Sequence, residues 1–250
     1  MSDKTVIMDF SGVRSEAFQT GAGNFISLDC RAIDGTDCYC DEDAASAIRR
    51  MLEPFGHGGV HFIDTGNYHY LTRFWTEKIR RPYSLLLFDH HPDLQEPRFE
   101  GVLSCGGWVL EMLRSDPFLR DVVMVGVDDS LLCVTEPFRD RVRVIGEDEA
   151  AVLPPEAIAE RLKLAFPAYV SIDKDVLCGC CARTNWDQGS LTVERLTAIL
   201  DALVKGCGII GADICGGLTV REGATAEDFR INALSDAALL EFLSERISEA

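Results

Sequence analysis

The fold of this chain is decided by residues 85–93, Leu85-Leu86-Leu87-Phe88-Asp89-His90-His91-Pro92-Asp93. The four apolar residues follow the turn-prone Pro82 and form a continuous run, which is typical of a parallel strand buried on both faces. The polar residues come at the carboxyl end of that strand, where α/β sheets place their functional groups. The stretch therefore predicts a parallel sheet with its chemistry at one edge.

Three polar side chains follow one another at alternate positions there: Asp89, His91 and Asp93. In an extended backbone, residues i, i+2 and i+4 project to the same side, so these three would share one small volume, whereas His90 would point away from them. Carboxylates packed that closely repel each other, and without a counter-cation one would have to take up a proton. A bound metal ion removes the repulsion, so we interpret the three as metal ligands.

Two further stretches end in the same way. Residues 169–175 form a short apolar strand that ends in Asp173 and Asp175, and residues 60–69 form a strand that runs into a turn carrying His69. If the three strands lie side by side, their ends bring together six side chains: His69, Asp89, His91, Asp93, Asp173 and Asp175. This oxygen-rich set has too many donors for one small cation and suits two manganese-like ions better than a four-coordinate zinc.

The same residues resemble the signatures of a known family. The segment Asp89-His90-His91-Pro92-Asp93 resembles the Asp-x-His-x-Asp signature of the arginase and agmatinase (ureohydrolase) family, and Ser171-Ile172-Asp173-Lys174-Asp175 resembles its Ser-x-Asp-x-Asp signature. The segment Gly66-Asn67-Tyr68-His69 shares only the glycine and the histidine of the family's Gly-Gly-Asp-His. The motifs follow the family's order and approximate spacing, so the resemblance covers about residues 60–220. It implies an arginase-like sheet of about eight strands, and a hydrolase with two Mn²⁺ ions and a bridging hydroxide that Asp93 orients.

Strands and helices alternate along the chain, which predicts a single α/β domain over residues 1–250 with helices on both faces of a mostly parallel sheet, a three-layer αβα sandwich. We expect strands at 5–10, 24–29, 60–64, 84–88, 122–127, 142–145, 168–172 and 207–214. We expect helices at 42–52 with Asp41 as N-cap, 70–80, 108–114, 154–164, 193–204, and 236–247 with Ser235 as N-cap. The first two strands, joined by a glycine-containing connection, are expected to form an edge pair, and residues 178–189 an irregular loop.

Other polar residues receive weaker interpretations. Gln95, Cys105, Asn185 and Asp213 are candidates for lining the substrate cavity. Asp64 is interpreted as solvated charge. Three function classes stay open at this point: a binuclear hydrolase of guanidino or amide C–N bonds, a deacetylase-like amide hydrolase with one zinc, and a metal-binding or ligand-binding protein without catalysis.

Three departures from the family concern the substrate and the second metal motif. Where the resemblance places a proton-shuttling histidine before Gly106, this chain has Cys105, and where it places a guanidinium-binding glutamate, counted from Asp213, this chain has Gly216. The Asp-Pro that closes the family's second metal motif is replaced by Cys178-Gly179. Because a buried guanidinium without a facing carboxylate costs several kcal/mol, we expect arginine and agmatine to be poor substrates.

Composition bounds the partners and the location. The formal net charge of −17 argues against nucleic acid or anionic membranes as partners, because phosphate binding needs clustered Lys and Arg. No apolar run approaches the roughly 18 residues that a membrane span needs, and the start lacks the apolar core of a signal peptide, so we expect a cytoplasmic protein that acts on a small molecule. A homo-oligomer is compatible with the sequence. The ten cysteines are expected to be reduced thiols. The cluster Cys178, Cys180 and Cys181 and the pair Cys38 and Cys40 could bind a soft metal, but neither has the paired C-x-x-C spacing of a zinc site.

Overall fold

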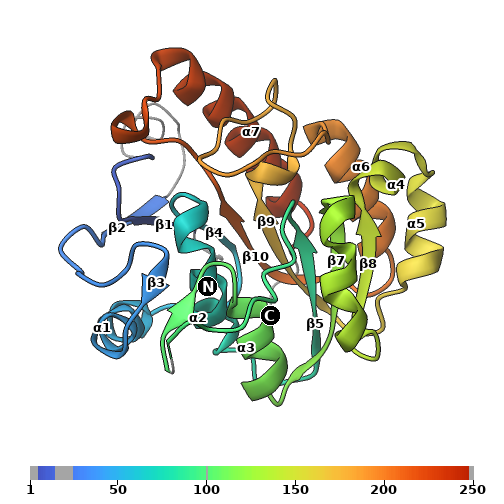
Figure 1. Ribbon diagram of the computed structural model, residues 1–250, viewed down its shortest axis with the longest axis horizontal. Coiled ribbons are helices and arrows are strands. Elements are labelled where there is room, and N and C mark those ends of the chain that lie inside the picture. The colour runs from blue at the N-terminus through green and yellow to red at the C-terminus, as the bar shows by residue number, and fades with distance from the viewer. Residues whose placement is uncertain (1–4, 15–24, 100, 248–250) are drawn as a thin grey trace.

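The computed structural model describes residues 5–14, 25–99 and 101–247. Its centre is an eight-stranded sheet in the order β2-β1-β4-β10-β9-β5-β7-β8, in which every pair of neighbours is parallel (Figure 1). The strands are β1 (Thr5–Asp9), β2 (Phe25–Asp29), β4 (Val60–Phe62), β5 (Tyr83–Phe88), β7 (Leu119–Val127), β8 (Val142–Gly146), β9 (Ala168–Asp173) and β10 (Ile209–Cys215). The predicted α/β fold and strand number are confirmed.

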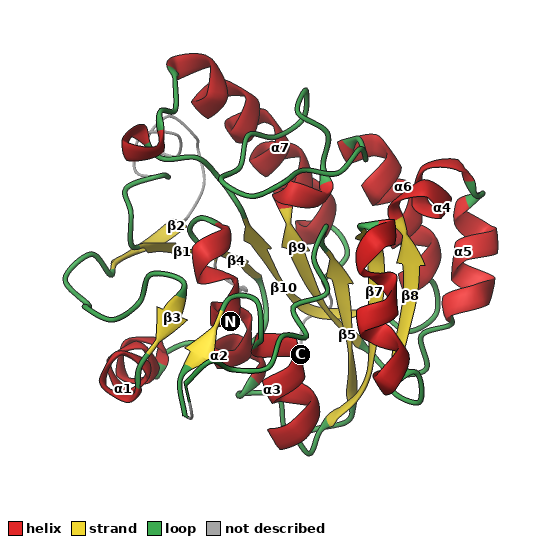
Figure 2. Ribbon diagram, viewed as in Figure 1, coloured by secondary structure: helices red, strands yellow, loops and turns green. Residues whose placement is uncertain are grey.

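Helices cover both faces of the sheet (Figure 2). One face carries α1 (Glu42–Leu52), α2 (Thr72–Thr76) and α3 (Trp108–Ser115), and the other carries α4 (Glu147–Val152), α5 (Pro155–Leu162), α6 (Val193–Val204) and α7 (Ala226–Ser244). Four short 3-10 helices join these elements: η1 (Gly66–Leu71), η2 (Asp129–Phe138), η3 (Lys174–Val176) and η4 (Val220–Glu222). In the described part of the chain, no helix combines the length and the apolar content that a membrane crossing requires.

Strand β5 shows why the apolar run is continuous. Leu85 and Leu87 pack into the core under α1–α3, whereas Leu86 and Phe88 pack into the core under α4–α7. All four have no exposed surface. Since fully burying one such side chain contributes about 1.5–3 kcal/mol, this strand stabilises both layers and fixes the position of the residues that follow it.

A small antiparallel ribbon was not predicted. Its strands are β3 (Tyr39–Cys40) and β6 (Leu103–Ser104), which pair Tyr39 with Ser104. Two-residue strands carry too little alternation to be recognised in a sequence. The ribbon brings segments about 65 residues apart in the chain to one place, beside the site described below.

Several predicted elements differ from the structure. The last helix begins at Ala226, not at 236, and ends at Ser244; its N-cap is Thr225, whose hydroxyl accepts from Asp228 N while the Asp228 carboxylate accepts from Thr225 N. The predicted cap Ser235 lies inside this helix, where its hydroxyl donates to the carbonyl of Cys181. The predicted helix 70–80 is shorter, since it is divided into η1 and α2 and ends at Thr76.

The N-terminal strands also differ in part. Strand β2 forms the edge of the sheet, but β1 lies between β2 and β4 and is an inner strand. The glycine-containing connection, residues 15–24, lies outside the described residues. Asp64 is not solvated as predicted: it is fully buried and accepts hydrogen bonds from the backbone N–H groups of Phe10 and Ser11, both at 2.9 Å. This carboxylate fixes the loop after β1 to the end of β4.

Candidate metal centre

The six predicted ligands meet at the carboxyl edge of the sheet, but by a different route from the one expected. Strands β9 and β5 are neighbours, whereas β10 separates β4 from β9. His69 reaches the others because η1 follows β4 and passes toward the end of β9. Gly66, at the start of η1, lies against the side chain of Asp173 at the end of β9: a Cβ added to Gly66 would be 3.2 Å from Asp173 Oδ2.

The first group surrounds one imidazole nitrogen. His69 Nδ1 lies 3.1 Å from Asp89 Oδ2, 3.2 Å from Asp93 Oδ2 and 3.5 Å from Asp173 Oδ2. All four side chains are at most 8% exposed. Three carboxylate oxygens and one nitrogen therefore face a common point in the protein interior.

The second group shares a residue with the first. His91 Nδ1 lies 2.9 Å from Asp175 Oδ2 and 3.7 Å from Asp89 Oδ1. Two sets of residues could thus each hold a metal ion, because the donor atoms within each set lie within 4.8 Å of one another. The first set is His69, Asp89 and Asp173, and the second is Asp89, His91 and Asp175. Asp89 directs one oxygen to each set, which is the arrangement that two cations bridged by a carboxylate require.

The charges of these groups strongly shift their pKa values. Burial alone would lower the pKa of His91, but hydrogen bonds to Asp175 and Asp89 outweigh it and raise that pKa to about 11. His69 behaves alike: burial disfavours its charge, yet Asp89 and Asp93 raise its pKa well above the usual value. Burial, followed by repulsion from Asp175, raises the pKa of Asp173 to about 7, and burial together with the charge of Asp89 raises that of Asp175 to about 6. The site therefore holds protons that a divalent cation would displace.

Asp89 gives an independent test of whether the residues fit a metal. Its Oδ2 atom is buried and has no hydrogen-bond partner among the described residues, since its 3.1 Å approach to His69 Nδ1 lacks hydrogen-bond geometry. A buried carboxylate oxygen without a partner is costly. A hard cation is a fitting partner for it, because carboxylate oxygens are the ligands that such cations prefer.

A second layer of hydrogen bonds orients His69. The Ser171 hydroxyl donates to Asp213 Oδ1 at 2.7 Å and lies 2.9 Å from His69 Nε2. Because Ser171 gives its only hydrogen to Asp213, we assign a hydrogen to His69 Nε2, which points to Ser171. The proton that a metal would displace from His69 is therefore the one on Nδ1, which faces the carboxylates. Asp213, predicted as a lining residue, is instead fully buried behind Ser171 and away from the cavity.

A cavity of about 320 Å³ opens above the six side chains, all of which line it. Of the predicted substrate residues, Gln95 and Cys105 line this cavity. Asn185 does not; its amide donates to Asn67 Oδ1 at 2.8 Å instead. Sequence reasoning missed Tyr39, Arg98 and Trp186, which form much of the wall. Tyr39 sits on the unpredicted ribbon and Trp186 on the predicted irregular loop, so no periodic pattern marked them.

Trp108 was missed as well. Its indole Nε1–H donates to Asp93 Oδ2 at 2.5 Å, and Asp93 has a left-handed backbone with φ of 49°. A left-handed non-glycine residue costs energy and persists only where its surroundings hold it. Here Trp108 provides one of those restraints, from the first residue of α3.

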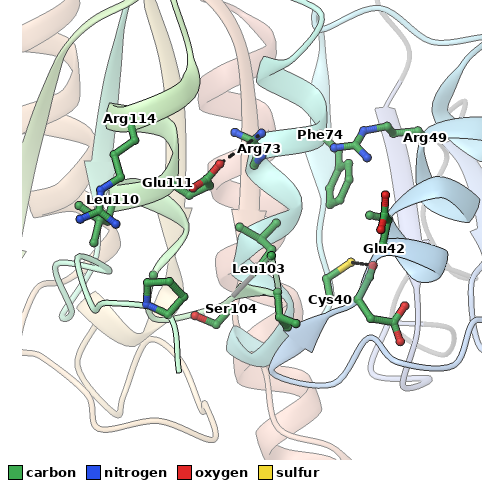
Figure 3. A pocket seen from close by; sticks show the side chains of 16 residues that line it. Cys40, Glu42, Arg49, Arg73, Phe74, Leu103, Ser104, Leu110, Glu111 and Arg114 are labelled. Atoms are coloured by element: carbon green, nitrogen blue, oxygen red, sulfur yellow. Dashed lines mark hydrogen bonds and ion pairs between the residues drawn. The ribbon is translucent and has the colours of Figure 1, made fainter. Parts of the chain in front are cut away.

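A neighbouring cavity of about 350 Å³ contains none of the six side chains (Figure 3). Its wall includes Arg49, Arg73 and Arg114. Each of these arginines is paired with a carboxylate: Arg49 with Glu77, Arg73 with Glu111 and Arg114 with Glu96. The positive charge of the cavity wall is therefore already compensated, and we assign no ligand to this cavity.

Comparisons with known proteins agree with this geometry. The structure of arginase from Medicago truncatula has a TM-score of 0.73 and 21% identity, covering 97% of this chain and 86% of that one. The structure of formiminoglutamase from Trypanosoma cruzi with Mn²⁺ has a TM-score of 0.70 and 12% identity, covering 98% and 94%. At these identities the likeness concerns the fold.

The sequence comparisons extend further. An uncharacterised protein of Thermotoga maritima is 30% identical over 211 residues, which make up 84% of this chain and 78% of that protein. The sequence model of the arginase family matches residues 30–219, a range that includes every residue of both donor sets. The chain belongs to the arginase family, as its three motifs suggested.

Proposed function

We propose that this protein is a hydrolase that uses two Mn²⁺ ions to cleave a C–N bond of guanidino, formimino or amide type in a small molecule. The observation that carries the proposal is Asp89, which directs one oxygen toward each of two histidine-containing donor sets. Family membership supports it independently.

In this proposal His69, Asp89, Asp93 and Asp173 would hold the first cation, and Asp89, His91 and Asp175 would hold the second. When bound, such a pair would supply a hydroxide nucleophile near neutral pH and would polarise the bond under attack. The chain positions the reaction: Asp93, held by Trp108, orients the attacking group and can accept its proton. Tyr39, Trp186 and Gln95 enclose the substrate in a cavity near the lower end of the usual range for small molecules.

Two positions where the family resemblance places substrate-handling groups do not favour arginine or agmatine. Gly216 has φ of 96°, and a Cβ added to it would lie 2.7 Å from Asp173 Oδ1, so the backbone there leaves no room for a carboxylate side chain. Cys105 is a poor proton shuttle, because a hydrogen bond with Cys38, together with burial, raises the pKa of its thiol far above the usual range. Both observations support a substrate other than the two guanidines that the family name suggests.

Two alternatives predict different measurements. A deacetylase-like enzyme with one zinc would leave part of the donor set without a function, and a binding protein would hold the ions without turning over any compound of the panel described below. Elemental analysis after purification with manganese should return about two ions per chain, the number that two-metal hydrolases hold. The loaded protein should release urea, ammonia or formamide from one member of a panel of guanidino, formimino and amide compounds. Less than half an ion per chain, or one zinc with acetate release from acetylated amines, would refute the proposal.

A further inference from the structure

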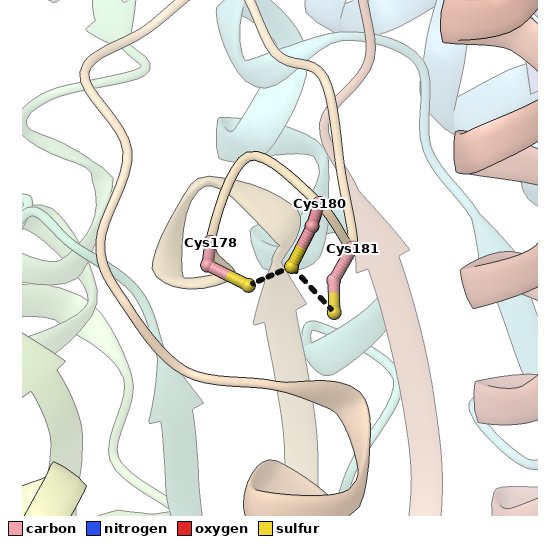
Figure 4. A group of neighbouring side chains, drawn as sticks. All are labelled: Cys178, Cys180 and Cys181. Carbon is pink, nitrogen blue, oxygen red and sulfur yellow. Dashed lines mark hydrogen bonds between the residues drawn. The ribbon is translucent and has the colours of Figure 1, made fainter.

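Three thiols converge at a point that the proposed reaction does not use. Cys178, Cys180 and Cys181 lie on the loop after β9, all three are free, and their sulfur atoms lie within 4.8 Å of one another (Figure 4). The Cys178 and Cys180 sulfurs are 2.9 Å apart, and those of Cys180 and Cys181 are 4.0 Å apart. None of them lines the cavity above the histidine and aspartate cluster.

The spacing can be compared with that of a thiolate metal site. Sulfur atoms bound to one Zn²⁺-sized ion at about 2.3 Å lie about 3.8 to 4.0 Å from each other, whether the three are part of a tetrahedron or of a planar triangle. The distance between Cys180 and Cys181 matches this value. The Cys178 and Cys180 sulfurs, at 2.9 Å, need only separate by a small rotation of exposed Cys180.

The loop backbone holds the thiols in this arrangement. Cys178 N donates to Leu191 O at 2.8 Å, and the carbonyl of Cys178 accepts from Cys181 N at 2.8 Å and Ala182 N at 3.1 Å. These hydrogen bonds form a tight turn that keeps the three cysteines next to one another.

The turn is also held from α7. Arg183 Nη1 lies 2.7 Å from where a Cβ on Gly179 would sit, so the guanidinium packs against the glycine between the first two cysteines. Arg183 pairs with Asp228 of α7 at 3.2 Å, which fixes the guanidinium beside the turn.

We propose that Cys178, Cys180 and Cys181 form a second metal site, which binds one soft, thiophilic cation of the Zn²⁺, Cd²⁺ or Cu⁺ class. The donor set distinguishes it from the oxygen-rich centre, because thiolates select soft ions and carboxylates select hard ones. Solvent completes the coordination on the exposed side of Cys180.

The cation would stabilise the wall of the substrate cavity. The loop that begins at Cys178 carries Trp186 into that wall, and it returns to η3, just after β9, where Gly189 N donates to Asp175 O at 2.7 Å. At its other side, the Cys181 carbonyl accepts from Ser235 of α7. A metal ion bound by the three cysteines at the start of the loop would thus link the end of β9, the cavity wall and α7.

Cadmium titration tests the site, because thiolate-to-cadmium charge transfer absorbs in the near ultraviolet and carboxylate or imidazole ligation does not. The protein is reduced, its oxygen-rich centre is loaded with Mn²⁺, and Cd²⁺ is then added. We expect the absorption to saturate at one Cd²⁺ per chain in the parent and in Cys133→Ser, which removes an exposed thiol elsewhere. The triple substitution Cys178→Ser, Cys180→Ser, Cys181→Ser should abolish the absorption.

Cys180→Ser alone serves as the second variant, since Cys180 is exposed and belongs to neither hydrophobic core. It should weaken Cd²⁺ binding by more than the roughly tenfold that even an outer-shell change costs. All variants should keep their Mn²⁺-dependent rise in melting temperature, which separates this site from the proposed active centre. Three outcomes would overturn the proposal. The triple variant keeps the absorption, the reduced parent protein shows no absorption, or the parent protein binds no Cd²⁺ because a disulfide between Cys178 and Cys180 persists.

Discussion

The indole of Trp108 donates its only hydrogen bond to Asp93 Oδ2, at 2.5 Å, although fifteen residues separate the two in the chain. Trp108 has no exposed surface and opens α3, so its position is fixed by the helix and by the core beneath it. Asp93 sits in a left-handed backbone and directs the same oxygen to within 3.2 Å of His69 Nδ1. The rigid indole thus determines where a proposed ligand and proton acceptor points.

Trp108→Phe should therefore impair the site more than the fold. Removing an outer-shell hydrogen bond typically costs about 10–100-fold in metal affinity or activity, and we expect a loss of that size in Mn²⁺ affinity. Trp75→Phe is the matched control, because Trp75 is equally buried but its Nε1 has no hydrogen-bond partner among the described residues. Equal Mn²⁺ affinity in the two variants, measured by calorimetry, would show that the Trp108 hydrogen bond does not position Asp93.

Metal binding should raise the melting temperature through Asp89. A ligand that binds only the folded state stabilises it by about 2.7 kcal/mol at a hundredfold excess over its dissociation constant. Because Asp89 belongs to both donor sets, Asp89→Ala should abolish the Mn²⁺-dependent rise, whereas Asp140→Ala, at an exposed turn, should keep it. A rise of the same size in Asp89→Ala, measured by scanning fluorimetry, would show that the ligand assignment is wrong.

The effect of metal should also grow with pH. The folded-state pKa of Asp173 is raised from 3.8 to about 7, so its contribution to the stability of the metal-free protein is fully present below pH 3.8 and is lost as the pH rises toward 7. A bound cation prevents this loss of stability, because it neutralises the ionised carboxylate of Asp173. At higher pH the cation also competes with fewer protons for its ligands. The Mn²⁺-dependent rise in melting temperature should therefore be larger at pH 8 than at pH 5.5.

Calorimetry gives the complementary measurement. His91, with a pKa of about 11, and Asp173, with one of about 7, hold protons at neutral pH that a metal must displace. Mn²⁺ binding at pH 7 should then release protons, seen as a binding enthalpy that changes with the ionisation enthalpy of the buffer. An enthalpy that is the same in every buffer would contradict the proton-holding arrangement of the site.

The fold could be predicted because its main signals are local. A continuous apolar run such as 85–88 requires burial on both faces, and parallel strands end at the same edge, so the residues after β5 and β9 had to meet. The start of α1 was equally readable, since Asp41 accepts from Ala44 N as a cap residue should. In each case the physical cause lies within a few residues of its effect.

The missed features depend on contacts between distant segments. That His69 reaches Asp173 follows from η1 passing the end of β10, and the order of β4, β10 and β9 is not encoded in any one segment. Asp64 is buried only because Phe10 and Ser11 supply its donors. The start of α7 is different: the capping box of Thr225 and Asp228 is local and readable, and the expected start at Ser235 passed over it.

Gly216 offers a test of the crowding behind the proposed ligand Asp173. Two glycines have nearly the same positive φ, 96° at Gly216 and 95° at Gly223. A Cβ on Gly216 would lie 2.7 Å from Asp173 Oδ1 and 3.0 Å from Lys174 N, whereas a Cβ on Gly223 would meet nothing within 4 Å. The pair therefore separates backbone strain, which both share, from a collision that only Gly216 has.

Both Gly216→Ala and Gly223→Ala should lose about 1–2 kcal/mol of unfolding free energy, the cost of a left-handed alanine. Gly216→Ala should lose more than this and should also bind Mn²⁺ more weakly, because its methyl group pushes against a proposed ligand. Gly216→Glu should likewise fail to produce urea from arginine, since the backbone that would present the carboxylate cannot accommodate it. The measurements are denaturant unfolding and Mn²⁺ titration of the two alanine variants. If both variants lose the same unfolding free energy and the same Mn²⁺ affinity, Gly216 is required only for its backbone angle. A carboxylate side chain could then be accommodated beside Asp173.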